Sequence, residues 1–303
     1  MRAGLVIGLH GSTEDAPRWT DVLAQAVAAE EAGFDLVVLE DALLYRDERK
    51  TIGYWEAIAM AAALGAATSR IEIGHSVINA PYRPAAFTAK IAETIDEITG
   101  GRYVLGIGLG NTPYDYEPFG IPADRRYARF AEALPIIADL LRTGRVSFDG
   151  EFHRARDAEL VLRGPRPQGP PIVVAARGPK MLELAARHAD GWNWWTVSGT
   201  ERSELEDVVR GFEEACQAVG RSTHDLARSL DVYSVLPPGG DDPRPDDGGV
   251  LRGSSAEIAE SLLGFAELGF DEVRLDLAWA GPVSAKSNGV RALSDVVRLV
   301  HAG

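Results

Sequence analysis

Residues 172–193 read IVVAARGPKMLELAARHADGWN. This stretch contains the strand–helix–strand pattern that is repeated along the chain. A short run of strand-forming residues ends at Ala176, and another begins at Gly191. The residues between them have helical spacing, with an apolar face made of Met181, Leu182, Leu184 and Ala185. A strand, a covering helix and a further strand are typical of an α/β fold with a parallel sheet.

The same unit recurs along the whole chain. Short strand-like runs end near Gly, Asn or Asp, and apolar residues follow at the three- or four-residue spacing of a helix that packs on a sheet. The expected strands are residues 2–9, 34–40, 71–79, 102–108, 171–176, 191–197, 230–236 and 272–278. Eight such units in 303 residues predict one (β/α)8 TIM barrel spanning residues 1–303. A doubly wound open sheet is the competing architecture.

Two segments interrupt this alternation. Residues 146–171 contain Asp149–Gly150 between strand-like runs, which predicts a hairpin inserted before the fifth strand. Residues 237–249, PPGGDDPRPDDGG, lack apolar anchors and predict a solvated loop. The helical stripes include one that begins at Trp19 and one final helix that contains Val290, Leu293, Val297 and Val300.

The composition limits the classes of partner. The chain has 31 basic and 45 acidic residues and a net charge of −14, so we expect no binding to nucleic acid or to anionic membranes. The single cysteine, Cys216, excludes an internal disulfide, and no His, Asp or Glu grouping has metal-ligand spacing. The first residues resemble a buried strand more than a signal peptide, which favours a cytoplasmic location.

The turn after the fifth expected strand has the features of an anion site. Pro179 suits the first helical position, and Gly178 lets the backbone approach a bound group closely. The exposed N–H groups of the helix, with Arg177 and Lys180, would attract a phosphate. A simple Gly-Pro turn with no ligand is the alternative.

Glycines end the fourth expected strand in residues 102–110, RYVLGIGLG. Gly106, Gly108 and Gly110 do not form a dinucleotide fingerprint, because Asn111 occupies the last position and no helix follows at once. Glycines at a strand end fit better with a flat ring that lies against the backbone.

The order and spacing of these blocks resemble the luciferase-like monooxygenase superfamily, whose members are (β/α)8 barrels that bind reduced FMN or the deazaflavin coenzyme F420. The resemblance extends over residues 29–47, 67–110, 129–153, 175–193 and 254–275. It implies a small-molecule substrate and a possible homodimer. The sequence of residues 175–182, AARGPKML, resembles the F420-dependent branch more than the FMN-dependent branch, and FMN is the alternative cofactor.

The resemblance also implies roles for individual residues. A bulge in the third strand, often with a non-proline cis peptide, would lie against the cofactor ring at Ser76 and Val77. The end of the fourth strand, from Gly108 to Asn111, would lie near the same ring. The cofactor phosphate would be held by the loop Ala176, Arg177, Gly178, Pro179 and Lys180.

One departure from the family concerns proton transfer. Many relatives have Asp-His after the second strand, whereas this chain has Asp41-Ala42, and Asn111 stands where some F420-dependent dehydrogenases carry a glutamate. The catalytic candidates are therefore Asp41, His10, His75 and Asn111, although a lone strand histidine is more often a core residue. The leading interpretation is hydride transfer with F420. An FMNH2-dependent monooxygenase, a non-catalytic flavin-binding barrel and a phosphosugar isomerase or lyase are the alternatives.

Overall fold

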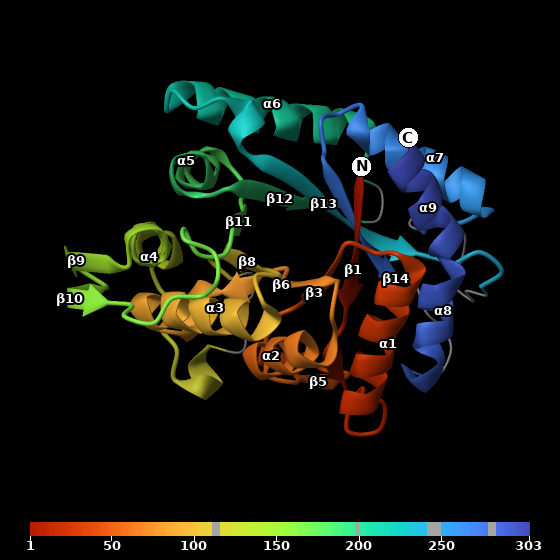
Figure 1. Cartoon of the computed structure of the whole chain (residues 1–303), viewed down its shortest axis with the longest axis horizontal. Helices are drawn as coiled ribbons and strands as arrows, with labels where there is room; N and C mark the ends of the chain where they lie inside the picture. The colour runs from red at the N-terminus through yellow and green to blue at the C-terminus, as the bar shows by residue number, and fades with distance from the viewer. Residues whose placement is uncertain (111–115, 198–199, 241–249, 278–282) are drawn as a thin grey trace.

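The computed structural model describes residues 1–110, 116–197, 200–240, 250–277 and 283–303. Within these residues, eight parallel strands form a closed barrel with helices around it (Figure 1). The barrel strands are β1 (Arg2–Ile7), β3 (Leu36–Leu39), β6 (Glu72–His75), β8 (Tyr103–Gly108), β11 (Ile172–Ala175), β12 (Gly191–Trp195), β13 (Ala227–Val235) and β14 (Glu272–Leu277). Pairing of β11 with β8 closes the sheet, which confirms the barrel and rules out the open sheet.

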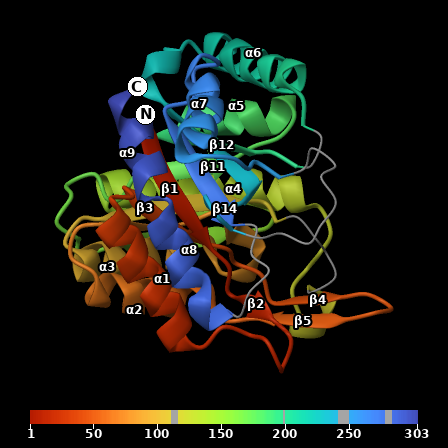
Figure 2. The ribbon, with the colours of Figure 1, turned by 90° about the vertical axis from the view of Figure 1, so that its right-hand side faces the viewer.

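The helices cover the outside of the barrel, and the two termini lie near each other on one side (Figures 1 and 2). They are α1 (Trp19–Ala32), α2 (Ala57–Ala67), α3 (Ala85–Thr99), α4 (Arg126–Thr143), α5 (Pro179–His188), α6 (Arg202–Ala218), α7 (Ser255–Ala266), α8 (Lys286–Ala292) and α9 (Ser294–Ala302). Short 3-10 turns span Ala80–Tyr82, Glu117–Phe119, Thr223–Asp225 and Val283–Ala285. None of the described helices combines the length and apolar character that a bilayer span requires.

Two expectations about the helices are wrong in detail. The expected final helix is two helices, α8 and α9, because the N–H of Leu293 bonds to the carbonyl of Val290 in a tightened turn that interrupts the helix. Trp19 begins α1 as expected, but its side chain is 37% exposed. It stands at the first position of the helix, where the chain has only begun to approach the barrel wall.

Two antiparallel additions accompany the barrel. The expected hairpin is present as β9 (Arg145–Asp149) and β10 (Arg154–Glu159), directly before β11. A three-stranded sheet was not expected: β2 (His10–Gly11), β5 (Thr51–Tyr54) and β4 (Leu44–Arg46) lie together at one end of the barrel (Figure 2). Of the expected loop over residues 237–249, residues 241–249 lie outside the described part.

Strand alternation divides the side chains between the helices and the barrel interior. On β12, Trp192 and Trp194 are buried, and Trp192 stacks on Phe212 of α6. Asn193 and Trp195 line a cavity at the opposite face of the strand. The barrel interior also contains charge: Arg274 of β14 is fully buried and donates to Glu272 Oε1 at 2.7 Å. The core therefore supports a polar site at the carboxyl ends of the strands.

Candidate active site

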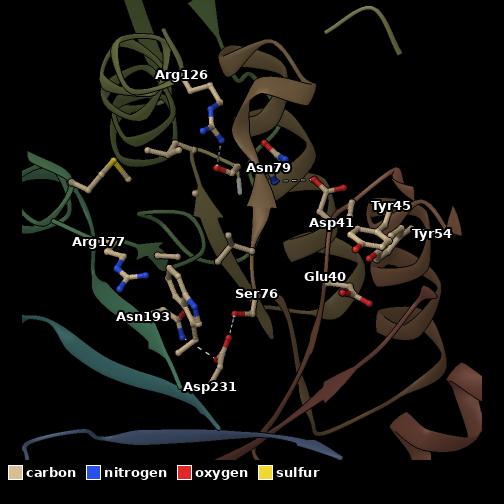
Figure 3. A pocket seen from close by; sticks show the side chains of 18 of the residues that line it. Glu40, Asp41, Tyr45, Tyr54, Ser76, Asn79, Arg126, Arg177, Asn193 and Asp231 are labelled. Carbon is tan, nitrogen blue, oxygen red and sulfur yellow. Dashed lines mark hydrogen bonds between the residues drawn. The ribbon is translucent and has the colours of Figure 1, made fainter. Parts of the chain in front are cut away.

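A cavity of about 630 Å³ opens at the carboxyl ends of the barrel strands (Figure 3). This is the face on which TIM barrels carry their active sites. Its wall includes residues at or just beyond the ends of β3, β6, β8, β11, β12 and β13. These residues include Glu40, Asp41, Ala42, Ser76, Val77, Gly108, Arg177, Asn193, Trp195, Asp231 and Tyr233.

The third barrel strand has the expected bulge. Gly74 pairs with Val104 of β8, and Ile78 pairs with Ile107 of β8. Between these two pairs the segment after β6 is one residue longer than β8, and this extra residue forms the bulge. The strand resumes as β7 (Ile78–Asn79), and the peptide between Ser76 and Val77 is cis, as predicted. A Cβ on Gly106 would lie 1.7 Å from the carbonyl oxygen of His75, so the bulge requires glycine at position 106.

A buried carboxylate holds the first side of the bulge. Ser76 Oγ donates to Asp231 Oδ2 at 2.6 Å, and Asn193 Nδ2 donates to Asp231 Oδ1 at 3.0 Å (Figure 3). Burial raises the pKa of Asp231, while the Arg274 guanidinium 3.8 Å away acts in the opposite direction. Ser76 is thereby fixed between the bulge and the floor of the cavity.

A second carboxylate holds the other side of the bulge. The backbone N–H of Asn79 donates to Asp41 Oδ2 at 2.9 Å, and Tyr116 Oη donates to Asn79 Oδ1 at 2.9 Å. Arg83 pairs with Asp41 at 2.7 Å and also with Glu56 at 2.6 Å. Although burial opposes it, the hydrogen bond and charge of Asp41 raise the pKa of Arg83. Asp41 therefore lies in the cavity wall with its oxygens occupied by structural donors.

The turn after β11 has the geometry that the sequence predicts. Gly178 has φ +77°, and Pro179 is the first residue of α5. Arg177 and Lys180 are exposed, and among the described residues neither pairs with a carboxylate; their partners are the rings of Trp194 and Tyr127. In a chain with 45 acidic and 31 basic residues, two such cations at an uncapped helix N-terminus favour binding of an anion.

The cavity also reaches this turn from its inner side. Arg177 and Met181 line it, and Ala176, Gly178, Pro179 and Lys180 lie beside them in sequence. Arg126, at the start of α4, lines the same cavity and donates to the carbonyl of Gly110 at 2.8 Å. The expected phosphate loop and the expected ring support at Ser76, Val77 and Gly108 thus border one space.

The two candidate histidines differ in position. His75 is fully buried, with Nδ1 2.9 Å from Tyr103 Oη and Nε2 3.3 Å from the carbonyl oxygen of Ala57. Burial lowers the pKa of His75 to about 4, and its ring does not line the cavity. These contacts are those of a core residue.

His10 contacts the cavity through a partner. Its Nδ1 lies against Glu40 Oε1, and this hydrogen bond raises the pKa of His10. Glu40 itself lines the cavity, while the His10 ring packs on Tyr54 with centroids 5.4 Å apart. The His10–Glu40 pair therefore extends from the cavity wall, at Glu40, to the protein surface, at His10.

The remaining catalytic candidate, Asn111, lies outside the described residues. Sequence reasoning missed Asn193, Asp231, Tyr45 and Arg126 as wall residues. A polar residue inside a strand-like run, as in GWNWW and LDVYSV, was the available signal for Asn193 and Asp231.

Comparison with known proteins gives consistent matches. The family model described as luciferase-like monooxygenase matches residues 1–236. The F420-dependent glucose-6-phosphate dehydrogenase of Beutenbergia cavernae is 38% identical over 235 residues, which cover 75% of this chain and 67% of that protein. The 5,10-methylenetetrahydromethanopterin reductase of Archaeoglobus fulgidus is 37% identical over 194 residues, covering 64% and 54% of the two chains.

The fold is also similar to that of solved structures. An F420-dependent secondary alcohol dehydrogenase, in complex with an F420-acetone adduct, superposes with a TM-score of 0.82. The superposition covers 99% of this chain and 98% of that one, at 18% sequence identity. At this identity the likeness concerns the fold.

Proposed function

The chain belongs to the luciferase-like monooxygenase family, and we propose that it is an oxidoreductase that uses coenzyme F420 for hydride transfer to or from a small organic substrate. The observation that carries the proposal is the position of Arg177 and Lys180, which pair with no carboxylate of the described ranges, at the start of α5 beside a cavity lined by Ser76 and Val77. The relative named as F420-dependent, at 38% identity, favours the deazaflavin over FMN.

The residues present fit such a cofactor. We assign the phosphate to Arg177, Lys180 and the N–H groups that follow Gly178, because no other part of the described chain comes within 4 Å of the point where a Cβ on Gly178 would stand. Ser76, Val77 and Gly108 would support the ring, which supplies a hydride when reduced. The cavity of about 630 Å³ is in the range of small-ligand sites.

The candidate catalytic residues receive different roles. We assign Asp41 a positioning role, because it receives the Asn79 N–H and pairs with Arg83. His75 is assigned to the core by its buried contacts. His10 remains a candidate acid or base through Glu40, and Ala42 lines the cavity without a group that could carry a proton.

The test is a parallel titration of the protein with F420 and with FMN, each oxidised and reduced, followed by absorbance and fluorescence. We expect micromolar binding of F420 that is lost in Gly178→Asp, since a carboxylate there would repel the phosphate. The matched control is Gly220→Asp, at a glycine with φ +70° and equally open surroundings beyond α6. Preference for reduced FMN would support the monooxygenase alternative, and binding of neither cofactor would reject the proposal.

A further inference from the structure

The cavity has two opposite sides that differ in charge. In the closed strand order β11-β12-β13-β14-β1-β3-β6-β8, the pair β8 and β11 stands across the barrel from β14 and β1. Arg177 follows β11 and Arg126 begins the helix after β8, and together they define the cationic pole. Glu40, with Tyr45 and Tyr54, lines the cavity beside β1 and β3, and these three define the acidic pole. In Figure 3, Ser76 lies between Arg177 and Glu40.

Aromatic side chains line the cavity together with the carboxylate of the acidic pole. Tyr45 comes from β4 and Tyr54 from β5, and β5 pairs with β2 just beyond β1. Tyr233 of β13 lines the same cavity. The face of an aromatic ring attracts a cation, and a carboxylate framed by such rings is suited to a positively charged nitrogen.

Further carboxyl groups lie near the acidic pole. Asp276 of β14 interacts electrostatically with Glu40, and Lys286 and His10 act on the pKa of Asp276 in the opposite direction. Burial raises the pKa of Asp276 to about 6, which Lys286 only partly offsets. Asp231, in the cavity floor, adds a further carboxyl group whose Arg274 partner stands 3.8 Å away. Once His10 is neutral, an added positive charge would therefore be stabilised here, whereas an anion would be repelled.

We propose that the acidic pole binds the substrate through a positively charged nitrogen, so that the substrate class is an organic cation, namely an iminium ion. The inference rests on the proposed function, because it assumes that the cofactor occupies the cationic pole. It separates this chain from its relative named for glucose-6-phosphate. A phosphorylated sugar would place its charge against Glu40, whereas an organic cation would meet that carboxylate and two rings.

An iminium substrate also accounts for the absence of a histidine at position 42. When a hydride adds to an iminium carbon, one C–H bond forms and the C=N π pair becomes the nitrogen lone pair. The two electrons and the hydrogen would come from the reduced deazaflavin of the proposed function, and its return to the neutral oxidised form would also release one proton to the solvent. Because the substrate already carries its activating positive charge, no proton donor is required, and alanine is compatible with the reaction.

Binding measurements test the substrate class without turnover. The full-length protein, free and saturated with F420, is titrated calorimetrically with benzyltrimethylammonium, benzylamine, benzyl alcohol and benzoate at pH 7.5. We expect both cations to bind about tenfold or more tightly than benzyl alcohol, and benzoate to bind most weakly. Glu40→Gln should remove most of the cation preference, and the equally charge-changing Glu97→Gln, exposed on α3, should leave it intact.

A second variant protects the test against misfolding. Tyr54→Leu removes a ring of the acidic pole without changing charge and should also reduce the preference for cations over benzyl alcohol. Equal affinity for benzyl alcohol and the two cations, or an unchanged preference in both Glu40→Gln and Tyr54→Leu, would overturn the substrate class. F420 binding is read separately, so a protein that binds F420 but not the cations rejects the inference alone. A protein that binds neither rejects the proposed function as well.

Discussion

Ser76 and Asp231 are 155 positions apart in the chain, and the Ser76 hydroxyl donates to the Asp231 carboxylate at 2.6 Å. The contact joins the cis bulge after β6 to the middle of β13, across the barrel interior. On the other side of the bulge, Asp41 accepts the N–H of Asn79. The segment assigned to ring support is thus held by two buried carboxylates. Because both carboxylates belong to barrel strands or follow them directly, the barrel fixes the position of this segment.

Ser76→Ala should weaken both stability and cofactor binding. The substitution leaves Asp231 Oδ2 buried without its donor, which costs about 1–3 kcal/mol of unfolding free energy. Urea unfolding measures the loss, and F420 titration should show weaker binding. Ser261→Ala removes an exposed hydroxyl on α7 and should change stability by no more than about 0.5 kcal/mol. Equal losses of unfolding free energy in Ser76→Ala and Ser261→Ala would show that the hydrogen bond from Ser76 to Asp231 does not hold the bulge in place.

Gly178→Ala should separate backbone strain from ligand binding. Gly178 has φ +77° and Gly220 has φ +70°. At both positions a Cβ would stand more than 4 Å from the other atoms of the described residues, apart from its chain neighbours. Alanine at Gly178, where ψ is 160°, should cost about 1–3 kcal/mol through backbone conformation alone, because essentially only glycine adopts this region. We expect a lower melting temperature in both alanine variants, and a loss of F420 affinity for Gly178→Ala only. A parallel loss of affinity in Gly220→Ala would show that the effect is general destabilisation.

The sequence was sufficient to predict the barrel because its strands are signalled locally. Each of the eight expected runs overlaps an observed strand, and the turn Arg177–Lys180 combines Gly and Pro in the positions that a helix start requires. The cis bulge at Ser76 was also predicted, although it came from the family resemblance and not from the residue pattern.

What the sequence did not predict depends on contacts between distant strands. Asp41 was proposed as a catalytic group because its carboxylate follows a strand, but its distance to Arg83 is set by how β3 and the turn after β7 meet. The partnership of Glu40 with His10 likewise requires the register of β1 against β3. The sheet of β2, β4 and β5 was missed because its strands are short and polar, so alternation has too few residues to be recognised.

Asp41→Asn should be strongly destabilising. Its carboxylate is 2% exposed, and loss of its charge leaves the Arg83 guanidinium with only the exposed Glu56 as ion-pair partner. Breaking a buried pair in this way costs about 3–5 kcal/mol of unfolding free energy. Glu56→Gln breaks the exposed contact of the same arginine and should cost about 1 kcal/mol or less. Chemical denaturation of both variants gives the comparison, and equal small losses would show that Asp41 does not anchor the bulge.

Ala42→His should introduce a proton-transfer group into the cavity wall. Ala42 lines the cavity, and the Asp-His pair that the family resemblance leads us to expect at positions 41 and 42 motivates the substitution. If F420-linked oxidation of a secondary alcohol is limited by proton removal, turnover should rise, and a well-placed general base contributes about 10²–10⁴-fold. Ala42→Gln is the control for size and polarity without a proton-transfer role. Unchanged turnover in Ala42→His would leave the missing histidine without consequence for the reaction.

The affinity for a permanent cation should increase with pH. Burial raises the pKa of Asp276 to about 6, so this carboxyl group is neutral below that pH and negatively charged above it. The Glu40 hydrogen bond raises the pKa of His10, which loses its positive charge as the pH rises further. Lys286 and Asp231 also act electrostatically on Asp276, Lys286 lowering its pKa and Asp231 raising it. Both titrations therefore make the acidic pole more negative as the pH increases.

Benzyltrimethylammonium isolates this effect, because its own charge does not titrate. Its affinity, measured calorimetrically from about pH 5 to 8, should rise first through the ionisation of Asp276 and again as His10 becomes neutral. Asp276→Asn should remove the first rise and retain the second, and benzyl alcohol should show neither. By linkage, binding of the cation near pH 6 must release protons, because it favours the ionised carboxylate. Proton uptake, or an affinity that falls with pH, would show that Asp276 and His10 do not set the charge of this pole.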